Sequence, residues 1–177
     1  MAREDQIRDL VRHFLDDALT SPSGSGPQTV ALGADHGGFE LKQKLVAYVE
    51  ELGYGVEDCG THSQDSVDYP DLAQAVAERV ASGQHSWGIV VDGAGIGSAM
   101  VANKVPGVRA ALCYDVSSAR NSREHNHANV LTLGAGLIGE GLARQIVKTW
   151  LETPWGPGRH ARRIEKLKAV EGRYLRR

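Results

Sequence analysis

The sequence predicts an α/β fold: a three-layer sandwich in which helices cover both faces of a five-stranded parallel sheet. Five short apolar segments alternate along the chain with segments whose apolar residues recur at helical spacing. Strands and helices that alternate in units of about thirty residues form a parallel sheet with helices on both faces. A second indication lies in residues 88–104, where an apolar run is followed by alternate glycines and then by a helix-compatible pattern. That order is typical of a strand, a tight loop and the start of a helix.

The first strands and helices follow in order from this alternation. A short strand is predicted over residues 29–33 and a helix over 39–52. A second strand over 54–58 leads into a polar loop, after which Tyr69 and Pro70 open the next helix. The helix over 39–52 carries apolar residues at helical spacing: Phe39, Leu41, Leu45, Val46, Val49 and Leu52.

The second half of the chain repeats the pattern. The remaining strands are predicted at 89–91, 108–113 and 129–133, and the later helices at 115–125, 139–151 and 159–174. In a parallel sheet, functional groups collect beyond the carboxyl ends of the strands. Four polar residues that follow strands are therefore expected at one edge of the sheet: Asp35, His36, Asp92 and Tyr114.

Residues 1–28 are predicted to be separate from a domain at 29–177. Residues 3–19 place apolar side chains at helical spacing with charged residues between them, which predicts an amphipathic helix. Residues 20–28 are rich in Ser, Gly and Pro, as in flexible linkers. An isolated helix of this length is marginal in water. Its apolar stripe therefore needs a partner surface, either on its own domain or on another protein.

Composition limits the classes of function. The chain has 177 residues, 41% hydrophobic and 24% charged, as in soluble globular proteins. A formal net charge of -2 argues against general nucleic-acid binding. No apolar run approaches the ~20 residues of a membrane span, and the N-terminus lacks the apolar core of a signal peptide. Two cysteines are too few for a disulfide framework or a zinc site. We therefore expect a cytoplasmic protein with no structural metal.

Asp92 and the glycines that follow it, Gly93, Gly95 and Gly97, form the most informative local motif. Glycine permits positive φ and brings backbone N–H groups close to a ligand, and a helix start adds unpaired donors. The loop is therefore suited to an anion, although a tight packing turn is the alternative. Neither the dinucleotide motif nor the P-loop matches, because the glycine spacing differs and no Gly-Lys-Ser/Thr follows.

Residues 159–177 are strongly basic, with eight Lys or Arg against two acids. Arg159 and Arg163 are four residues apart in the last predicted helix and therefore share one face. Two interpretations remain open: both side chains bind one phosphate, or both are simply solvated.

Five motifs occur in one order: Gly33-Ala34-Asp35-His36-Gly37-Gly38, Asp68-Tyr69-Pro70, Gly93–Gly97 with Ala102-Asn103-Lys104, Arg123-Glu124-His125-Asn126, and Gly158-Arg159-His160. Over about residues 30–171 the chain therefore resembles the type B ribose-5-phosphate isomerase family and its relatives, the galactose- and allose-6-phosphate isomerases. The resemblance implies a Rossmann-like domain and a homodimer or homotetramer with sites at the interface. It also implies aldose–ketose isomerisation of a phosphorylated sugar without a metal or another cofactor.

The resemblance also implies roles for individual residues. His125, with Asn126 beside it, would open the sugar ring by acid–base transfer. Asp35 would position hydroxyl groups of the sugar, with a helix N-cap as its alternative role. Tyr69 and Asn103 would line the substrate pocket.

Phosphate and oxyanion contacts are implied in the same way. The phosphate clamp would consist of His36, Arg109, Arg159 and Arg163, and guanidinium groups suit a dianionic phosphate. A backbone oxyanion site for the enediolate would come from the glycine loop: Gly93, Ala94, Gly95, Ile96, Gly97 and Ser98.

The catalytic base is where the chain departs from the family pattern. Many members carry a cysteine at the position of Asp92, and others use a glutamate later in the loop, where this chain has Ser98. Ala94 stands where a hydroxyl is usual, and Cys59 and Cys113 lie elsewhere. Two interpretations follow. In the first, Asp92, with Ser98, supplies the base, as positioned carboxylates do in other enolisations. In the second, the chain is a catalytically impaired relative that binds or senses sugar phosphates.

The N-terminal segment has a resemblance of its own. A short amphipathic helix joined to a Pro/Gly/Ser linker resembles the encapsulation peptides that direct enzymes into bacterial microcompartments. This resemblance implies that residues 3–19 bind a microcompartment shell or cargo protein, and that the cytoplasmic chain resides inside such a compartment. No nucleic-acid or membrane partner is expected.

Overall fold

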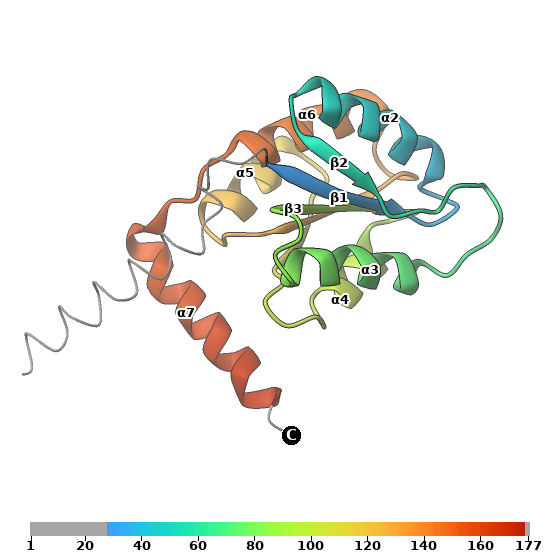
Figure 1. Ribbon diagram of the computed structural model, residues 1–177. Helices are drawn as coiled ribbons and strands as arrows, with labels where there is room; N and C mark the ends of the chain where they lie inside the picture. Colours follow the sequence, from blue (N-terminus) through green and yellow to red (C-terminus); the bar gives the residue numbers. More distant parts are fainter. Residues whose placement is uncertain (1–27, 176–177) are drawn as a thin grey trace, which may run out of the picture.

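A five-stranded parallel sheet forms the centre of the molecule (Figure 1). The computed structural model describes residues 28–175, and the predicted helix over 3–19 lies outside them. The strand order is β2-β1-β3-β5-β4, and every neighbouring pair is parallel. The predicted fold class is therefore confirmed. The strands are β1 (Thr29–Ala34), β2 (Gly55–Asp58), β3 (Trp87–Asp92), β4 (Ala110–Leu112) and β5 (Val130–Gly134).

Helices cover both faces of the sheet. Figure 1 shows α2 and α6 on one face and α3 and α4 on the other, and α5 packs beside α6. Within residues 28–175 no helix combines the length and the apolar character needed to cross a membrane. The helices are α2 (Phe39–Glu51), α3 (Tyr69–Ala81), α4 (Ile96–Ala102), α5 (Val116–Glu124), α6 (Glu140–Glu152) and α7 (Pro157–Tyr174).

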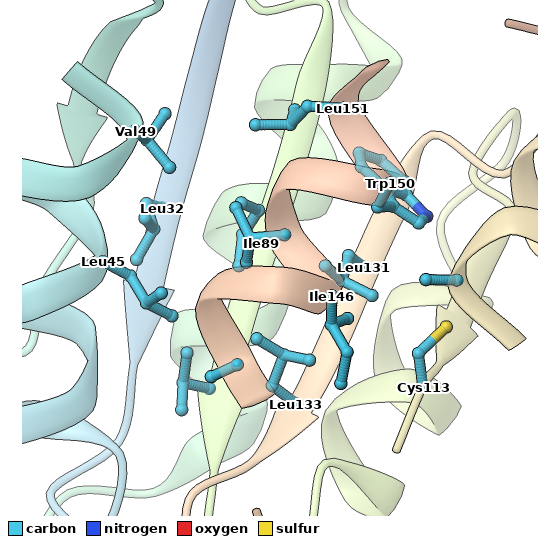
Figure 2. Close-up of a cluster of buried hydrophobic side chains, with 14 of the residues drawn as sticks. Leu32, Leu45, Val49, Ile89, Cys113, Leu131, Leu133, Ile146, Trp150 and Leu151 are labelled. Carbon is cyan, nitrogen blue, oxygen red and sulfur yellow. The ribbon is translucent and has the colours of Figure 1, made fainter. Parts of the chain in front are cut away.

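The central strand β3 shows why the strands are continuous apolar runs. All of its residues are buried. Ile89 and Val91 belong to the core under α2, α5 and α6, whereas Val90 belongs to the core under α3 and α4. Alternate side chains of a strand point to opposite faces, and here both faces are covered. Figure 2 shows the larger core, in which Ile89 packs among side chains from other elements, including Leu32 and Trp150.

The observed bounds agree with the predicted ones to within about two residues at most ends. The strand β4 is three residues shorter than the predicted strand 108–113. It pairs only with β5, and the N–H of Arg109 donates to the side chain of Asn129 at 2.7 Å instead of extending the ladder. The last helix begins at Pro157, with a non-helical backbone at Gly158.

A buried lysine ties the β2–α3 connection to the rest of the fold. Lys42 is fully buried, and its Nζ lies 2.5 and 2.6 Å from the two carboxylate oxygens of Asp58. Nζ also donates to the carbonyl of Thr61 at 2.8 Å, and the N–H of Thr61 donates to the carbonyl of Ala34 at 2.7 Å. Lys42 therefore holds the segment that leads to Tyr69 against the end of β1.

The sheet has two edges that matter for function. At the carboxyl edge, residues 35–38 and 92–98 follow the ends of β1 and β3. At the amino edge, residues 107–109 and 125–129 precede β4 and β5. Helix α5 runs back from the first edge to the second, as crossover helices do in parallel sheets. Figure 1 shows α7 extending away from the sheet on the side opposite to the arrowhead of β1.

Candidate active site

Asp92 organises the glycine loop at the carboxyl edge. It lies at the end of β3 with 5% of its surface exposed. Its Oδ1 accepts hydrogen bonds from the N–H of Ala94 at 2.8 Å and from the N–H of Gly95. Its Oδ2 accepts from the N–H of Ser98 at 3.1 Å and from the Ser98 hydroxyl. A carboxylate offers about four acceptor positions, so all of them are filled. The side chain therefore caps the start of α4.

Three amides of the loop remain available to a ligand. In the described part of the chain, the N–H groups of Gly93, Ile96 and Gly97 have no protein acceptor. Gly95 adopts a φ of 76°, a left-handed conformation that favours glycine and turns the chain into α4. Of the six backbone N–H groups predicted to bind the oxyanion, only these three can therefore do so in this conformation. The N–H groups of Ala94, Gly95 and Ser98 already donate to Asp92.

Two tyrosines border the loop. A Cβ atom at Gly97 would lie 2.5 Å from the ring of Tyr69, so only glycine fits beneath that ring. The hydroxyl of Tyr114 donates to the carbonyl of Ala94 at 2.7 Å. Both rings are partly exposed, so they form the rim of the loop and not its floor.

The turn between β1 and α2 packs against β3. A Cβ at Gly38 would lie 2.2 Å from the carbonyl oxygen of Val91, so the two segments touch backbone to backbone. Oδ1 of Asp35 accepts from the N–H of Gly38 at 2.9 Å, and Nδ1 of His36 lies 3.2 Å from the carbonyl of Val67. The carboxyl edge brings together these predicted site residues: Asp35, His36, Tyr69, Asp92, Gly93, Ala94, Gly95, Ile96, Gly97 and Ser98.

A second group of predicted residues lies at the amino edge. His125 ends α5, and its Nδ1 lies 2.8 Å from Nδ2 of Asn121. Asn126 donates to Oδ1 of the same Asn121 at 3.3 Å. The imidazole of His125 stacks on that of His160, with ring centroids 4.2 Å apart. Arg159 lies beside this pair, with Nε 3.4 Å from Nε2 of His160. His125 is therefore held between α5 and α7.

The amino edge is strongly cationic. Nε of Arg109 donates to the carbonyl of His127 at 2.7 Å, and Arg123 lies behind it with 4% of its surface exposed. Burial, and then repulsion by Arg109, lowers the pKa of Arg123 to about 10. Burial, and then the charges of Arg109 and Arg123, lowers the pKa of His127 to about 3. His127 is therefore neutral at physiological pH, and it stacks on Trp155 with ring centroids 4.3 Å apart.

Helix α7 adds further positive charge. Arg159 and Arg163 are one helical turn apart and both are exposed. Burial lowers the pKa of His160, and the neighbouring His125, Arg159 and Arg163 lower it further. A group of guanidinium side chains of this kind suits a phosphate dianion.

The chain thus holds the two groups at opposite edges of its sheet. Strands of five or six residues keep such edges about 17–20 Å apart. Asn103 does not join the loop residues either. Asn103 follows α4, and its side-chain amide forms two hydrogen bonds with the backbone of Ala110. Nδ2 of Asn103 donates to the carbonyl of Ala110 at 3.0 Å, and the N–H of Ala110 donates to Oδ1 of Asn103 at 3.0 Å. This geometry gives Asn103 the role of attaching β4.

Two residues near the site were not singled out from the sequence. The spacing of Asn121 and His125, four apart on a helix, is a signal that indicates their contact. Arg123 has no such signal, because it is buried against Trp87 and Trp150, which are remote in the sequence. A cavity of about 410 Å³ opens nearby between the ends of α5 and α6, and none of the predicted site residues lines it.

The two cysteines do not supply a base. Burial raises the pKa of both the Cys59 and the Cys113 thiol, so both are protonated at neutral pH. Among residues 28–175 no group of three His, Cys, Asp or Glu side chains is arranged to hold a metal ion.

Comparison with known proteins places the chain in a family. The Ribose/Galactose Isomerase family matches residues 30–167. The ribose-5-phosphate isomerase B of Escherichia coli is 44% identical over 144 residues, which cover 81% of this chain and 97% of that protein. A D-erythrulose-4-phosphate isomerase of Pectobacterium atrosepticum is 39% identical, over 78% of this chain and 92% of its own. The structure of Clostridium thermocellum ribose-5-phosphate isomerase B is similar with a TM-score of 0.82 and 48% identity, over 83% of this chain and 99% of that one. The chain therefore belongs to the ribose/galactose isomerase family.

Proposed function

We propose that this protein interconverts a phosphorylated aldose and its ketose, with ribose 5-phosphate or a close analogue as substrate. The observation that carries the proposal is the carboxyl edge: a buried carboxylate, Asp92, lies beside three loop amides that have no acceptor among residues 28–175, and the ring of Tyr69 covers Gly97. A base next to donors for an oxyanion is what enolisation requires. Family members named as ribose-5-phosphate and erythrulose-4-phosphate isomerases support the same reaction class.

The reaction would proceed through an enediolate without a metal. Asp92 takes the proton from C2 of the open-chain aldose, and the C–H electrons form a C1–C2 double bond as the C1 carbonyl becomes an oxyanion. The amides of Gly93, Ile96 and Gly97 stabilise that oxygen, with about 3 kcal/mol for each well-placed donor. Protonation of O1, loss of the O2 proton and return of the carbon-bound proton to C1 complete the ketose. Asp35 holds a sugar hydroxyl.

The complete site would form between two subunits. His125, Arg109, Arg159 and Arg163 lie at the amino edge, too far from Asp92 for one small sugar phosphate to reach both groups within a subunit. In a homodimer or homotetramer, the carboxyl edge of one copy can face the amino edge of another. The exposed apolar side chains of Leu167 and Val170 on α7 support this arrangement, because they need a partner surface.

One observation favours the second candidate, a sugar-phosphate binding or regulatory relative without full activity. All acceptor positions of Asp92 are filled by donors from Ala94, Gly95 and Ser98. Asp92 can accept a proton from carbon only after one of these donors turns away. The Ser98 hydroxyl is the donor that can do so, because it rotates while the backbone amides are fixed. An isomerase therefore needs mobility at Ser98, and a binding protein does not.

The deciding experiment follows solvent deuterium exchange at the transferred carbon by NMR. The purified protein, treated with a chelator, is given ribose 5-phosphate, ribulose 5-phosphate, and four- and six-carbon aldose and ketose phosphates. Turnover of at least one pair is expected, and Asp92→Asn should slow exchange by at least about 100-fold. Asp115→Asn is the matched control, since Asp115 caps α5 at the same edge through the N–H of Ser118 at 2.8 Å. No turnover of any substrate by the wild type, with sugar phosphate still bound, would establish the second candidate.

Asp92→Cys sharpens the result. This substitution introduces the cysteine that many family members carry at this position, although a thiol cannot accept the loop hydrogen bonds as a carboxylate does. Activity in Asp92→Cys but not in the wild type would assign Asp92 to the loop structure alone. Activity in the wild type that Asp92→Asn leaves unchanged would remove Asp92 from the reaction.

We also propose that residues 1–28 direct the chain to a bacterial microcompartment. The support is the sequence alone: an apolar stripe over residues 3–19 and a linker over 20–28, both ahead of the matched family region. The partner would be a shell or cargo protein with an apolar groove.

A further inference from the structure

Arg123 is a buried cation without an acidic partner. It lies on α5 with 4% of its surface exposed, and among residues 28–175 it forms no ion pair with a carboxylate. A buried charge without a counter-charge is costly, and burial lowers the pKa of Arg123 to about 10. The nearby Arg109 adds repulsion to that cost. Something other than an ion pair must therefore account for its placement.

Two indole rings and one carbonyl hold the guanidinium. Its central carbon lies 3.9 Å from the ring centroid of Trp87 and 5.1 Å from that of Trp150. The two rings meet edge to face at 5.6 Å. Nη1 donates to the carbonyl of Ala128, while Nε has no hydrogen-bond partner among residues 28–175. These contacts come from β3 and α6, so Arg123 joins the sheet, a covering helix and the chain after α5.

The carbonyl that Arg123 holds belongs to the turn that carries His125. Nη1 of Arg123 fixes Ala128, and Nε of Arg109 fixes the preceding carbonyl, that of His127, at 2.7 Å. Within this turn His127 has a φ of 50°, a left-handed conformation that His, like Asn and Asp, adopts more often than other non-glycine residues do. Two consecutive carbonyls of this turn are therefore held by two arginines, and His125 lies two residues before the first of them.

We propose that Arg123 is a positioning residue, which holds the turn over residues 125–128 so that the imidazole of His125 faces the sugar ring. The inference rests on the proposed function in one respect, the assignment of ring opening to His125. Arg123 touches no substrate, because it lies beneath the turn and not on its surface. Its planar group suits the slot between two indoles, which an ammonium group would fill less well.

Substrate chemistry separates this role from a general structural one. Ribose 5-phosphate closes to a furanose through its free O4 hydroxyl and must be opened before isomerisation. In a four-carbon aldose 4-phosphate the phosphate occupies O4, so no furanose forms and no opening is needed. A defect in the placement of His125 therefore slows the five-carbon substrate selectively. A general loss of folded structure slows both substrates alike.

The test compares the turnover of ribose 5-phosphate with that of erythrose 4-phosphate. Arg123→Met is expected to lower the ratio of the two rates by at least tenfold, towards the value for His125→Gln. Arg123→Lys, which keeps the charge and a donor, should recover part of the ratio. Arg120→Met is the matched control, since Arg120 is an exposed arginine on the same helix, and its ratio should equal that of the wild type. An unchanged ratio in Arg123→Met, when His125→Gln lowers it, overturns the proposal and leaves the proposed function intact.

A readout without turnover completes the test. Amide hydrogen exchange at residues 125–128 should be faster in Arg123→Met than in the wild type, and unchanged in Arg120→Met. Equal exchange in all three proteins overturns the proposal even if activity changes. If His125→Gln does not lower the ratio, ring opening is not the task of His125, and the failure then lies in that part of the proposed function.

Discussion

Lys42→Met is expected to destabilise the protein through the ion pair with Asp58. Nζ of Lys42 is fully buried and donates to both carboxylate oxygens and to the carbonyl of Thr61. Burial raises the pKa of Asp58, but the hydrogen bonds from Lys42 and from the N–H of Gly60 lower it more, so the carboxylate stays ionised. Removal of Lys42 therefore leaves a partly buried negative charge without its counter-charge.

The expected size follows from the exposure of the two partners. Loss of one partner of a fully buried pair costs about 3–5 kcal/mol. The side chain of Asp58 is 27% exposed, so water can replace part of the lost interaction. We therefore expect a loss of about 2–3 kcal/mol in the free energy of unfolding. Helix α2 offers a matched control in Lys44, which is 54% exposed and pairs with Glu140 at 2.9 Å. Lys44→Met should cost about 0.5 kcal/mol or less.

Urea unfolding at neutral pH measures both variants. A double variant, Lys42→Met with Asp58→Leu, removes both charges and should recover part of the loss, because no unpaired carboxylate remains. If Lys42→Met unfolds within about 1 kcal/mol of the wild type, the pair is not a stabilising contact and the reasoning from burial is refuted.

Two further perturbations test the amino edge and the N-terminal segment. Unfolded His127 takes up a proton below its ordinary pKa of 6.5, whereas the folded residue has a pKa of about 3. The unfolded state thus binds more protons in this window, and wild-type stability falls as the pH falls from 7 to 4. His127→Asn tolerates the left-handed φ and should show a smaller fall in Tm over this range, whereas an equal fall would exclude His127 as the cause. A fluorescent protein fused to residues 1–28 should join a shell or self-associate, and should stop doing so with Leu10→Asp and Phe14→Asp. A chain cut to residues 29–177 should keep its Tm, and a large fall would show that the segment packs on its own domain.

The strands and the carboxyl edge were predictable because they depend on local pattern. A strand covered on both faces is an uninterrupted apolar run, as β3 is. Such a run can be recognised in the sequence without knowing which strands and helices pack against it. Parallel strands end at one edge, so Asp35 and Asp92 were expected together. What the pattern could not give was the orientation of the Asp92 carboxylate. Its partners Gly95 and Ser98 are close in sequence, but their hydrogen bonds depend on the φ of 76° at Gly95.

The amino edge was predictable in part. A residue that follows a strand lies at the carboxyl edge, and a residue that follows a crossover helix lies at the amino edge. That rule places His125, which follows α5, away from Asp92, although the family resemblance predicts that both act on one sugar. The burial of Arg123 was not predictable, because a charged residue at the end of a polar helix is usually solvated. Its surroundings come from Trp87 and Trp150, more than sixty residues apart in the sequence.

The separation of Asp92 from His125 leads to a prediction about mixed subunits. Asp92→Asn and His125→Gln should each strongly lower the turnover of ribose 5-phosphate in a homodimer, since every site lacks one group. In a hybrid dimer, one site receives Asp92 from one subunit and His125 from the other, and the second site receives both substitutions. Random exchange makes about half of the dimers hybrid, so about one quarter of the wild-type activity should return. The two chains can carry different affinity tags, be exchanged in mild urea and be purified through both tags, which doubles the expected value per dimer. If dimers that carry both tags remain inactive, each subunit must supply both groups to its own site. The proposal that the site forms between two subunits would then be wrong.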